Sequence, residues 1–187
     1  MINKKGKLVI ISAPSGTGKG TVINKLLELR PDFAFSVSAT TRKPRSGETE
    51  GKSYYFLTHE RFSEMIENNE FLEYAQYIGE YYGTPEKPVN EMIDNGITVI
   101  LDIEVLGAKQ IMLKRPDAVT VFITAPDMDE LEKRLRGRGT DSEEKLIARL
   151  ERARLELEEQ CHYDHIVIND KVMRAAEEIL SIIDRKD

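Results

Sequence analysis

The sequence predicts an α/β fold in which a parallel β-sheet is flanked by helices, and three observations support this prediction. Four short apolar runs, at residues 7–12, 97–103, 118–124 and 165–169, are typical of strands that are buried on both faces. A helical pattern follows each run, and this alternation indicates parallel strands joined by right-handed crossovers. A glycine-rich turn, "SAPSGTGKGT" at residues 12–21, joins the first strand to the first helix.

The elements follow in order along the chain. After the strand at 7–12, the first helix places Val22, Leu26 and Leu29 on one face, and Pro31 ends it. The sequence then becomes polar and aromatic, with strand-like segments at 35–41, 53–57 and 70–77 and a helix signal from Thr58 to Asn68. This polar and aromatic pattern of short strands around one helix predicts an inserted, mostly antiparallel subdomain.

A second insertion is expected between residues 127 and 160, where charged residues are dense. The segment 128–139 ends in glycine, and the segment 141–160 begins with an Asp-Ser pair that can cap a helix. These features predict two helices with an exposed joint, an arrangement that could act as a lid.

Composition limits the classes of function. The chain has 187 residues, enough for one α/β domain with small insertions, and no apolar run is long enough to span a bilayer. The amino terminus does not resemble a signal peptide, so we expect a cytoplasmic protein without membrane contact. A net charge of −6 argues against a nucleic-acid partner, and the single cysteine, Cys161, excludes a disulfide framework and a cysteine-rich zinc site.

The glycine-rich turn predicts a nucleoside triphosphate site of the P-loop type. It lies between a buried strand and a helix amino terminus, where backbone N–H groups and the helix dipole favour an anion. Lys19 adds a positive charge between phosphates. The motif departs from the usual pattern, because Ala13 replaces its first glycine and Gly20 replaces the hydroxyl residue after the lysine. The expected phosphate-binding residues are Ser15, Gly16, Thr17, Gly18, Lys19, Gly20 and Thr21.

The missing hydroxyl at position 20 bears on the cofactor. We expect Mg²⁺ to accompany ATP and to be held mainly by phosphates and water, with Thr21 and Asp102 as candidate assisting ligands. Asp102 ends the apolar run 97–103, where a Walker-B-type carboxylate would lie, although an ordinary strand-end aspartate is the alternative.

The sequence resembles the guanylate kinase family over nearly its whole length. Besides the glycine-rich turn, the blocks that are similar, in the family's order, are "SVSATTRKPRSGE", "GKSYYF", "NEFLEYAQYIGEYYGT", "LDIEVLGAK", "RLRGRGTDSEE" and "YDHIVIND". The resemblance implies transfer of the γ-phosphoryl group of MgATP to GMP or dGMP in purine nucleotide recycling. It also implies a core at residues 1–35, 89–127 and 160–187, a GMP-binding subdomain at 36–88 and a lid at 128–159.

The resemblance assigns residues to the GMP side. Arg42 and Arg45 match the arginines that bind the GMP phosphate, and a guanidinium suits that task because its fork offers paired donors. Tyr54 and Tyr82 match hydroxyl donors to the same phosphate. Glu73 matches the carboxylate that accepts hydrogen bonds from guanine. The remaining matched positions are Ser38, Thr84, Asp102 and Glu104.

The resemblance also assigns cations to the lid. Arg134 and Arg138 are four residues apart, so they share one helix face, and they match arginines that close over the ATP phosphates. Arg149 matches a third lid arginine and lies on the apolar stripe of its helix, which predicts that it points into a cleft. With Lys19 and Arg42, these arginines form the expected catalytic set. Asn169 would lie beside the adenine ring.

Two departures and two alternatives remain. Glu104 and Leu106 stand where the family commonly has aspartate and glutamine, which leaves the hydrogen bonding behind the guanine pocket open. A protein-binding module related to guanylate kinase would typically lack the phosphate loop that this chain retains. A phosphotransferase for adenylate or a sugar bisphosphate would not require Glu73, Tyr82 and the "TTRKPRSGE" loop together. The oligomeric state, monomer or homo-oligomer, is open.

Overall fold

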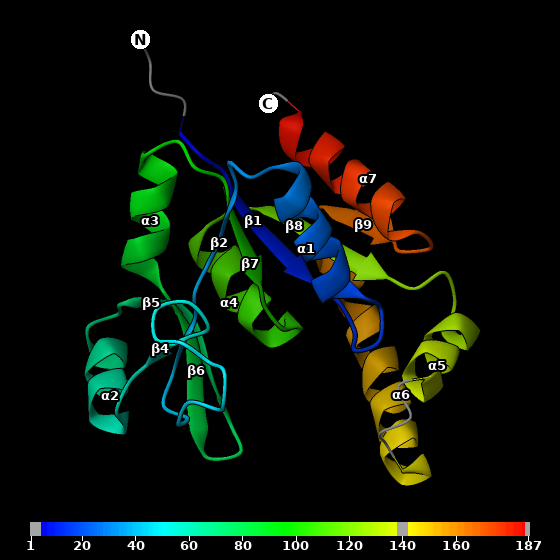
Figure 1. Ribbon diagram of the computed structural model, residues 1–187, viewed down its shortest axis with the longest axis horizontal. Coiled ribbons are helices and arrows are strands. Elements are labelled where there is room, and N and C mark those ends of the chain that lie inside the picture. Colours follow the sequence, from blue (N-terminus) through cyan, green and yellow to red (C-terminus); the bar gives the residue numbers. More distant parts are fainter. Residues whose placement is uncertain (1–4, 138–141, 186–187) are drawn as a thin grey trace.

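The computed structural model describes residues 5–137 and 142–185 and is built around a five-stranded parallel sheet (Figure 1). Its strands run in the order β2-β7-β1-β8-β9, and every neighbouring pair is parallel. Their bounds are β1 (Leu8–Ser12), β2 (Ala34–Phe35), β7 (Val99–Asp102), β8 (Val119–Thr124) and β9 (His165–Ile168). The predicted fold class is therefore confirmed, with β2 as a short edge strand.

Side-chain alternation in β1 explains why helices cover both faces of this sheet. Val9 and Ile11 pack on one face with α1 (Lys19–Leu29) and α7 (Val172–Asp184). Leu8 and Ile10 pack on the other face with α3 (Glu86–Asp94) and α4 (Val105–Lys114). All four side chains are buried, so the central strand is apolar from Leu8 to Ile11, as its continuous hydrophobic run predicts, and it ends in the buried Ser12.

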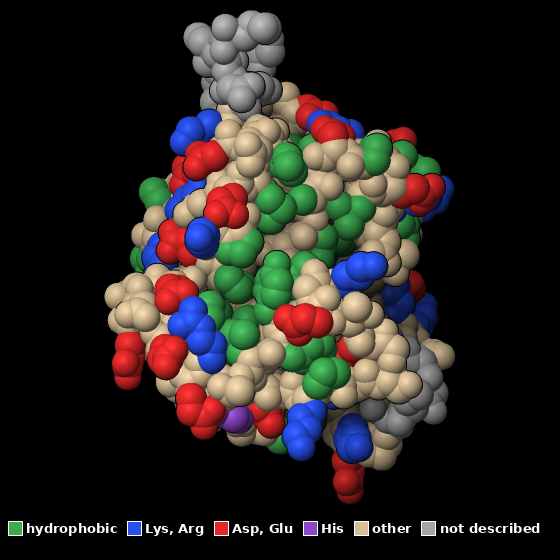
Figure 2. All heavy atoms as spheres, turned by 60° about the vertical axis from the view of Figure 1, so that its left-hand side comes forward, with side chains coloured by type: hydrophobic (Ala, Val, Ile, Leu, Met, Phe, Trp, Pro, Cys, Tyr) green, Lys and Arg blue, Asp and Glu red, His purple; other side chains and the backbone are tan. Residues whose placement is uncertain are grey.

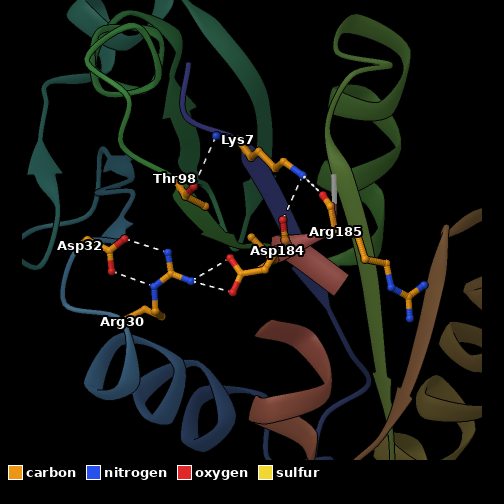
Figure 3. Close-up of polar contacts among 7 residues, drawn as sticks. Lys7, Arg30, Asp32, Thr98, Asp184 and Arg185 are labelled. Carbon is orange, nitrogen blue, oxygen red and sulfur yellow. Dashed lines mark hydrogen bonds and ion pairs between the residues drawn. The ribbon is translucent and has the colours of Figure 1, made fainter. Parts of the chain in front are cut away.

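A polar network joins α1, α7 and β1 at the amino-terminal ends of the parallel strands, opposite the end that carries the glycine-rich turn (Figure 3). Arg30, the residue that ends α1, donates hydrogen bonds to the carboxylates of Asp32 and Asp184 at 2.8–3.0 Å. The Lys7 ammonium donates to the carbonyl oxygens of Ile183 and Arg185 at the end of α7. The network therefore ties the carboxyl ends of α1 and α7 to the start of β1.

A second, mixed sheet has the strand order β4-β3-β6-β5, in which only β3 and β4 are parallel. Its core contains Phe62 and Phe71, whose ring centroids are 4.3 Å apart. The helix predicted from Thr58 to Asn68 is confirmed, because Thr58 caps it by accepting a hydrogen bond from the Arg61 N–H. The elements are β3 (Ala39–Thr40), β4 (Tyr55–Phe56), α2 (His59–Glu67), β5 (Phe71–Tyr77) and β6 (Glu80–Pro85).

The strand-like segment 35–41 is divided between the two sheets. Phe35 pairs with Ile100 in the parallel sheet, whereas Thr40 pairs with Tyr82 in the mixed sheet. The mixed sheet has an apolar cluster of its own, while Leu72 on β5 packs into a core cluster of the parallel sheet. The segment 36–38 therefore connects two sheets that also pack together. A groove of about 760 Å³ separates α2 and β4 from α3, and Figure 2 shows apolar side chains gathered on this face between charged ones.

The two helices α5 (Met128–Gly137) and α6 (Glu143–Glu158) pack together through Leu131, Leu135, Leu146 and Ala153. Ser142 caps α6 by accepting a hydrogen bond from the Lys145 N–H, as the sequence predicts. The predicted joint at 138–141 lies outside the described residues. A 3₁₀ turn (Glu159–His162) leads from α6 to β9. Across residues 5–137 and 142–185, no helix is long and apolar enough to cross a membrane.

Candidate active site

The glycine-rich turn lies at the carboxyl end of β1, with the mixed sheet and the α5–α6 pair on either side of this edge (Figure 1). Gly16 and Gly18 have φ angles of 95° and 87°, a left-handed conformation that other residues rarely adopt. A Cβ atom at Gly18 would lie 2.7 Å from the Asn169 amide nitrogen, and one at Gly16 would lie 2.8 Å from Leu135. A larger residue at either position would therefore have a strained backbone angle and would crowd a neighbouring side chain.

Asn169 and Thr17 hold the loop in shape. The buried Asn169 side chain donates a hydrogen bond of 2.7 Å from Nδ2 to the Thr17 carbonyl oxygen. The buried Thr17 hydroxyl donates one of 2.9 Å to the Pro14 carbonyl oxygen. These bonds satisfy carbonyl groups of the turn. Asn169, which the resemblance assigns to the adenine side, thus has a direct contact with the loop itself.

Lys19 begins α1 and reaches across to β7. Its Nζ lies 2.6 Å from Oδ1 of Asp102 and donates a second hydrogen bond of 3.1 Å to the Ile103 carbonyl oxygen. The two side chains are 18% and 30% exposed, so solvent only partly screens this ion pair. The lysine and the strand-end carboxylate predicted to serve one site are therefore adjacent.

Two of the predicted lid arginines contact the glycine-rich turn. Nη1 of Arg134 donates to the Thr17 carbonyl oxygen at 3.3 Å while its Nε donates to Glu130 at 2.9 Å. Nη2 of Arg149 donates to the Ser15 hydroxyl at 2.6 Å. Arg149 thus points from the apolar side of α6 toward the turn, as its position on the stripe predicts. The third predicted arginine, Arg138, lies outside the described residues.

On the other side of the edge, the basic loop that follows β3 is organised by Glu48. Its carboxylate accepts two hydrogen bonds from the Arg42 guanidinium, at 2.8 and 3.0 Å, and one from the Arg45 backbone N–H at 2.7 Å. Hydrogen bonding to Arg42 lowers the pKa of Glu48 to about 2. The guanidinium lies 5.4 Å above the Tyr54 ring, and Tyr54 and Tyr82 meet edge to face at 6.2 Å. The Arg45 side chain is exposed.

A buried carboxylate lies on β5, an edge strand of the mixed sheet. Glu73 on β5 is 7% exposed, and its Oε1 accepts a hydrogen bond of 2.6 Å from the hydroxyl of the buried Thr84 on β6. Burial raises the pKa of Glu73, because removal from water disfavours the charged form. Its Oε2 faces Gly107 on α4, where a Cβ atom would approach to 2.7 Å. Ser38 is half-buried just before β3.

Glu104 has a different environment. It directly precedes α4 without a side-chain capping bond, its side chain is 74% exposed, and its Oε2 lies 2.9 Å from Nη2 of Arg152 on α6. Arg152 is 53% exposed, and its pairing with Glu104 links α6 to α4. No role was predicted from the sequence for Arg152, Glu48 or Gly107. Glu48 could have been noticed as the one acidic residue inside "TTRKPRSGE", whereas the contact of Gly107 depends on tertiary packing.

Comparisons with known proteins agree with this geometry. A family model described as guanylate kinase matches residues 5–186. A guanylate kinase of Lactococcus lactis is 52% identical over 183 residues, covering 98% of this chain and 89% of the relative. One of Trichodesmium erythraeum is 53% identical, covering 89% of this chain and 90% of the relative. The crystal structure of a guanylate kinase from Anaplasma phagocytophilum has a TM-score of 0.74 at 35% identity, covering 98% of this chain and 87% of that chain. The chain therefore belongs to the guanylate kinase family.

Proposed function

We propose that this enzyme transfers the γ-phosphoryl group of MgATP to GMP, giving ADP and GDP, and that it also accepts dGMP. The observation that carries this proposal is the buried Glu73 carboxylate in the mixed sheet, on the opposite side of the sheet edge from the arginine-bearing helices α5 and α6. A carboxylate kept out of water needs a partner that offers donors, and guanine offers two on one edge, at N1 and N2. Adenine presents an acceptor at N1 and would leave the carboxylate unsatisfied, which a site of this kind rejects strongly.

We assign guanine recognition to three side chains. The hydrogen bond from Thr84 orients one oxygen of Glu73, so the carboxylate is held in place before the base arrives. Thr84 and Ser38 add hydroxyl groups for the O6 side of the base or its neighbours. We also assign Asp102, at the end of β7, and Glu104, at the start of α4, to the GMP side.

We assign the GMP phosphate to the basic loop. Arg42 and Arg45 supply positive charge, and the hydroxyl groups of Tyr54 and Tyr82 supply neutral donors. A bidentate guanidinium fixes both the position and the direction of a phosphate oxygen pair. This matters because the acceptor oxygen must lie in line with the bond that breaks at the γ-phosphorus.

We assign the ATP phosphates to the glycine-rich turn and the cations around it. Backbone N–H groups from Ser15 to Thr21, together with Lys19, would hold the β- and γ-phosphates. Arg134, Arg138 and Arg149 would stabilise the charge on the transferring group, and Asn169 would border the adenine side. Proton transfer by a general base is not needed, because the acceptor phosphate is already an anion at neutral pH.

Mg²⁺ would be bound with ATP. The residues present fit it, because Asp102 and Thr21 are oxygen donors near the lysine of the turn, and oxygen is the ligand that Mg²⁺ prefers. Within the described residues, no group of three or more His, Cys, Asp and Glu side chains could hold a metal alone, so phosphates and water would complete the coordination. The ion would supply charge neutralisation between the β- and γ-phosphates.

We further propose that residues 36–88 form the GMP-binding subdomain and residues 128–159 the lid, with 1–35, 89–127 and 160–187 as the core. The separate apolar clusters of the mixed sheet and of the α5–α6 pair support this division. Both units are expected to close on the core when substrates bind, because water at the reacting phosphates would allow ATP hydrolysis.

The test is ADP release from MgATP with GMP, dGMP or AMP as the acceptor. We expect rapid turnover with GMP and dGMP, little with AMP, and loss of this preference in Glu73→Gln. The matched control is Glu70→Gln, which changes a neighbouring carboxylate that pairs with Arg61. Binding of ATP without turnover on GMP would instead favour a non-catalytic protein-binding module, and turnover on another acceptor would favour a different phosphotransferase.

A further inference from the structure

Hydrogen bonds to Glu48 and Lys43 use three of the five N–H groups of Arg42, and the Tyr82 hydroxyl lies close enough to interact with the same guanidinium. The end of the guanidinium, formed by Nη1 and Nη2, donates to the two carboxylate oxygens of Glu48. The second hydrogen on Nη1 goes to the Lys43 carbonyl oxygen at 2.8 Å. The remaining hydrogens, on Nε and on the other position of Nη2, lie together on one edge of the planar group. That edge is itself a two-pronged donor suited to a phosphate.

Glu48 also shapes the loop that carries Arg42. The same oxygen that accepts from Nη1 accepts the Arg45 backbone N–H at 2.7 Å. The arginine and the carboxylate are only 15% and 21% exposed, so the pair is sheltered from solvent on most sides. The guanidinium carbon also lies over the Tyr54 ring, 5.4 Å from its centre, so an aromatic ring borders the pair. Glu48 therefore fixes the side chain of one arginine and the backbone of the other.

We propose that Glu48 is a positioning residue that holds Arg42 so that its Nε–Nη2 edge faces the 5′-phosphate of the acceptor nucleotide. The inference rests on the proposed function, in which Arg42 binds that phosphate. Glu48 does not touch the substrate. Its carboxylate cancels one positive charge of the loop, so the loop discriminates by the direction of its donors rather than by net charge alone. An arginine side chain without this partner would sample many rotamers and lose orientation.

The experiment measures GMP-dependent ADP release and GMP binding by calorimetry for Glu48→Ala and Glu48→Gln. We expect the KM and Kd for GMP to rise by about 10- to 100-fold in Glu48→Ala, the range for a misplaced binding group. The KM for ATP should stay within about 2-fold, and competitive inhibition by guanosine, which lacks the phosphate, should be unchanged. The KM and Kd for GMP of Glu48→Gln should lie between those of the wild type and Glu48→Ala, because the amide retains one acceptor.

Two controls separate positioning from a structural defect. Glu67→Gln changes an exposed carboxylate on α2 and should leave every constant unchanged. In an Arg42→Ala background, Glu48→Ala should add little, because its target is absent. An unchanged or lower KM for GMP in Glu48→Ala, or an equal weakening of guanosine and ATP, would overturn the inference. No GMP-dependent turnover by the unaltered chain would overturn the proposed function, whereas an unchanged KM and Kd for GMP in Glu48→Ala would overturn the positioning role only.

Discussion

Gly107 has a buried position against the carboxylate that we assign to guanine. A Cβ atom there would lie 2.7 Å from Oε2 of Glu73, 3.2 Å from its Cδ and 3.4 Å from its Cγ. Ordinary contact begins at 3.4 Å, so the carboxylate oxygen would have to move by 3.4 − 2.7 = 0.7 Å. The hydrogen bond from Thr84 to the same carboxylate is 2.6 Å long, and a displacement of this size would take it beyond the usual O–H···O range of about 3.0 Å.

We therefore predict that Gly107→Ala lowers kcat/KM for GMP by about 10- to 100-fold, the loss expected when a binding group is misplaced by close to 1 Å. The KM for ATP should change by less than about 2-fold, because the glycine-rich turn is not involved. Stability should change little, because alanine favours the helix by up to about 1 kcal/mol and the displaced carboxylate offsets this gain. Steady-state kinetics and thermal unfolding measure these quantities.

A double-mutant cycle tests whether the effect passes through Glu73. In a Glu73→Ala background there is no carboxylate to displace, so Gly107→Ala should have almost no further effect on GMP kinetics. Unchanged kcat/KM for GMP in the single variant would refute the reasoning. An equal loss of kcat/KM for GMP in the presence and absence of the Glu73 carboxylate would also refute it, since Gly107→Ala would then act through some other group.

Three further predictions follow from the same contacts. Glu73→Gln should leave the melting temperature at pH 7 unchanged or raise it by about 2–4 °C per kcal/mol gained. Burial raises the pKa of Glu73, so the charged wild-type carboxylate opposes folding at pH values above that pKa. As the pH falls through that pKa the carboxylate takes up a proton, and the difference in melting temperature between the wild type and Glu73→Gln should shrink. A difference in melting temperature that widens on acidification would contradict this. Arg30→Ala should lower the melting temperature by about 2–4 °C, for a loss of roughly 1 kcal/mol, with normal activity and a smaller effect at 1 M salt, as calorimetry in two buffers would show. Arg149→Lys keeps the charge and loses the planar fork, so kcat should fall by about 10²-fold or more while the KM for GMP changes little, which rapid-quench kinetics can check.

The parallel sheet was predictable because β1, β7 and β8 are short apolar runs that are almost wholly buried. The expected burial of residues 165–169 on both faces was wrong, because β9 is an edge strand whose Ile166 and Ile168 are 47% and 45% exposed. The two-residue strands β2 and β3 were not separable, since periodicity needs more residues than either contains. Their assignment to different sheets depends on pairing with Val99 and with Gly83, which are distant in the sequence. The helix from Thr58 was predictable because its cap is a local interaction.

In the candidate site, the direction of a side chain on its own helix was easier to predict than the residue it contacts on another element. The direction of Arg149 followed from the apolar stripe of its helix, which is a property of spacing along one element. The pairing of Arg152 with Glu104 joins α6 to α4, and the approach of Gly107 to Glu73 joins α4 to β5. No local pattern contains either contact, because each depends on how separate elements pack.

The partners of the site cations have a common chemical character. Lys19 is held by a carboxylate and a carbonyl, Arg134 by a carboxylate and a carbonyl, and Arg42 by a carboxylate and a carbonyl. In a chain with a net charge of −6, these acceptors keep a concentrated group of positive charges compatible with folding. For Lys19 and Arg134, substrate phosphates can replace these partners, because phosphates are stronger acceptors with more charge. Arg42 would keep Glu48 and bind phosphate through its Nε–Nη2 edge, as proposed above. Affinity for free phosphate should therefore be modest, and selectivity should come from ligands whose phosphates reach several of these groups at once.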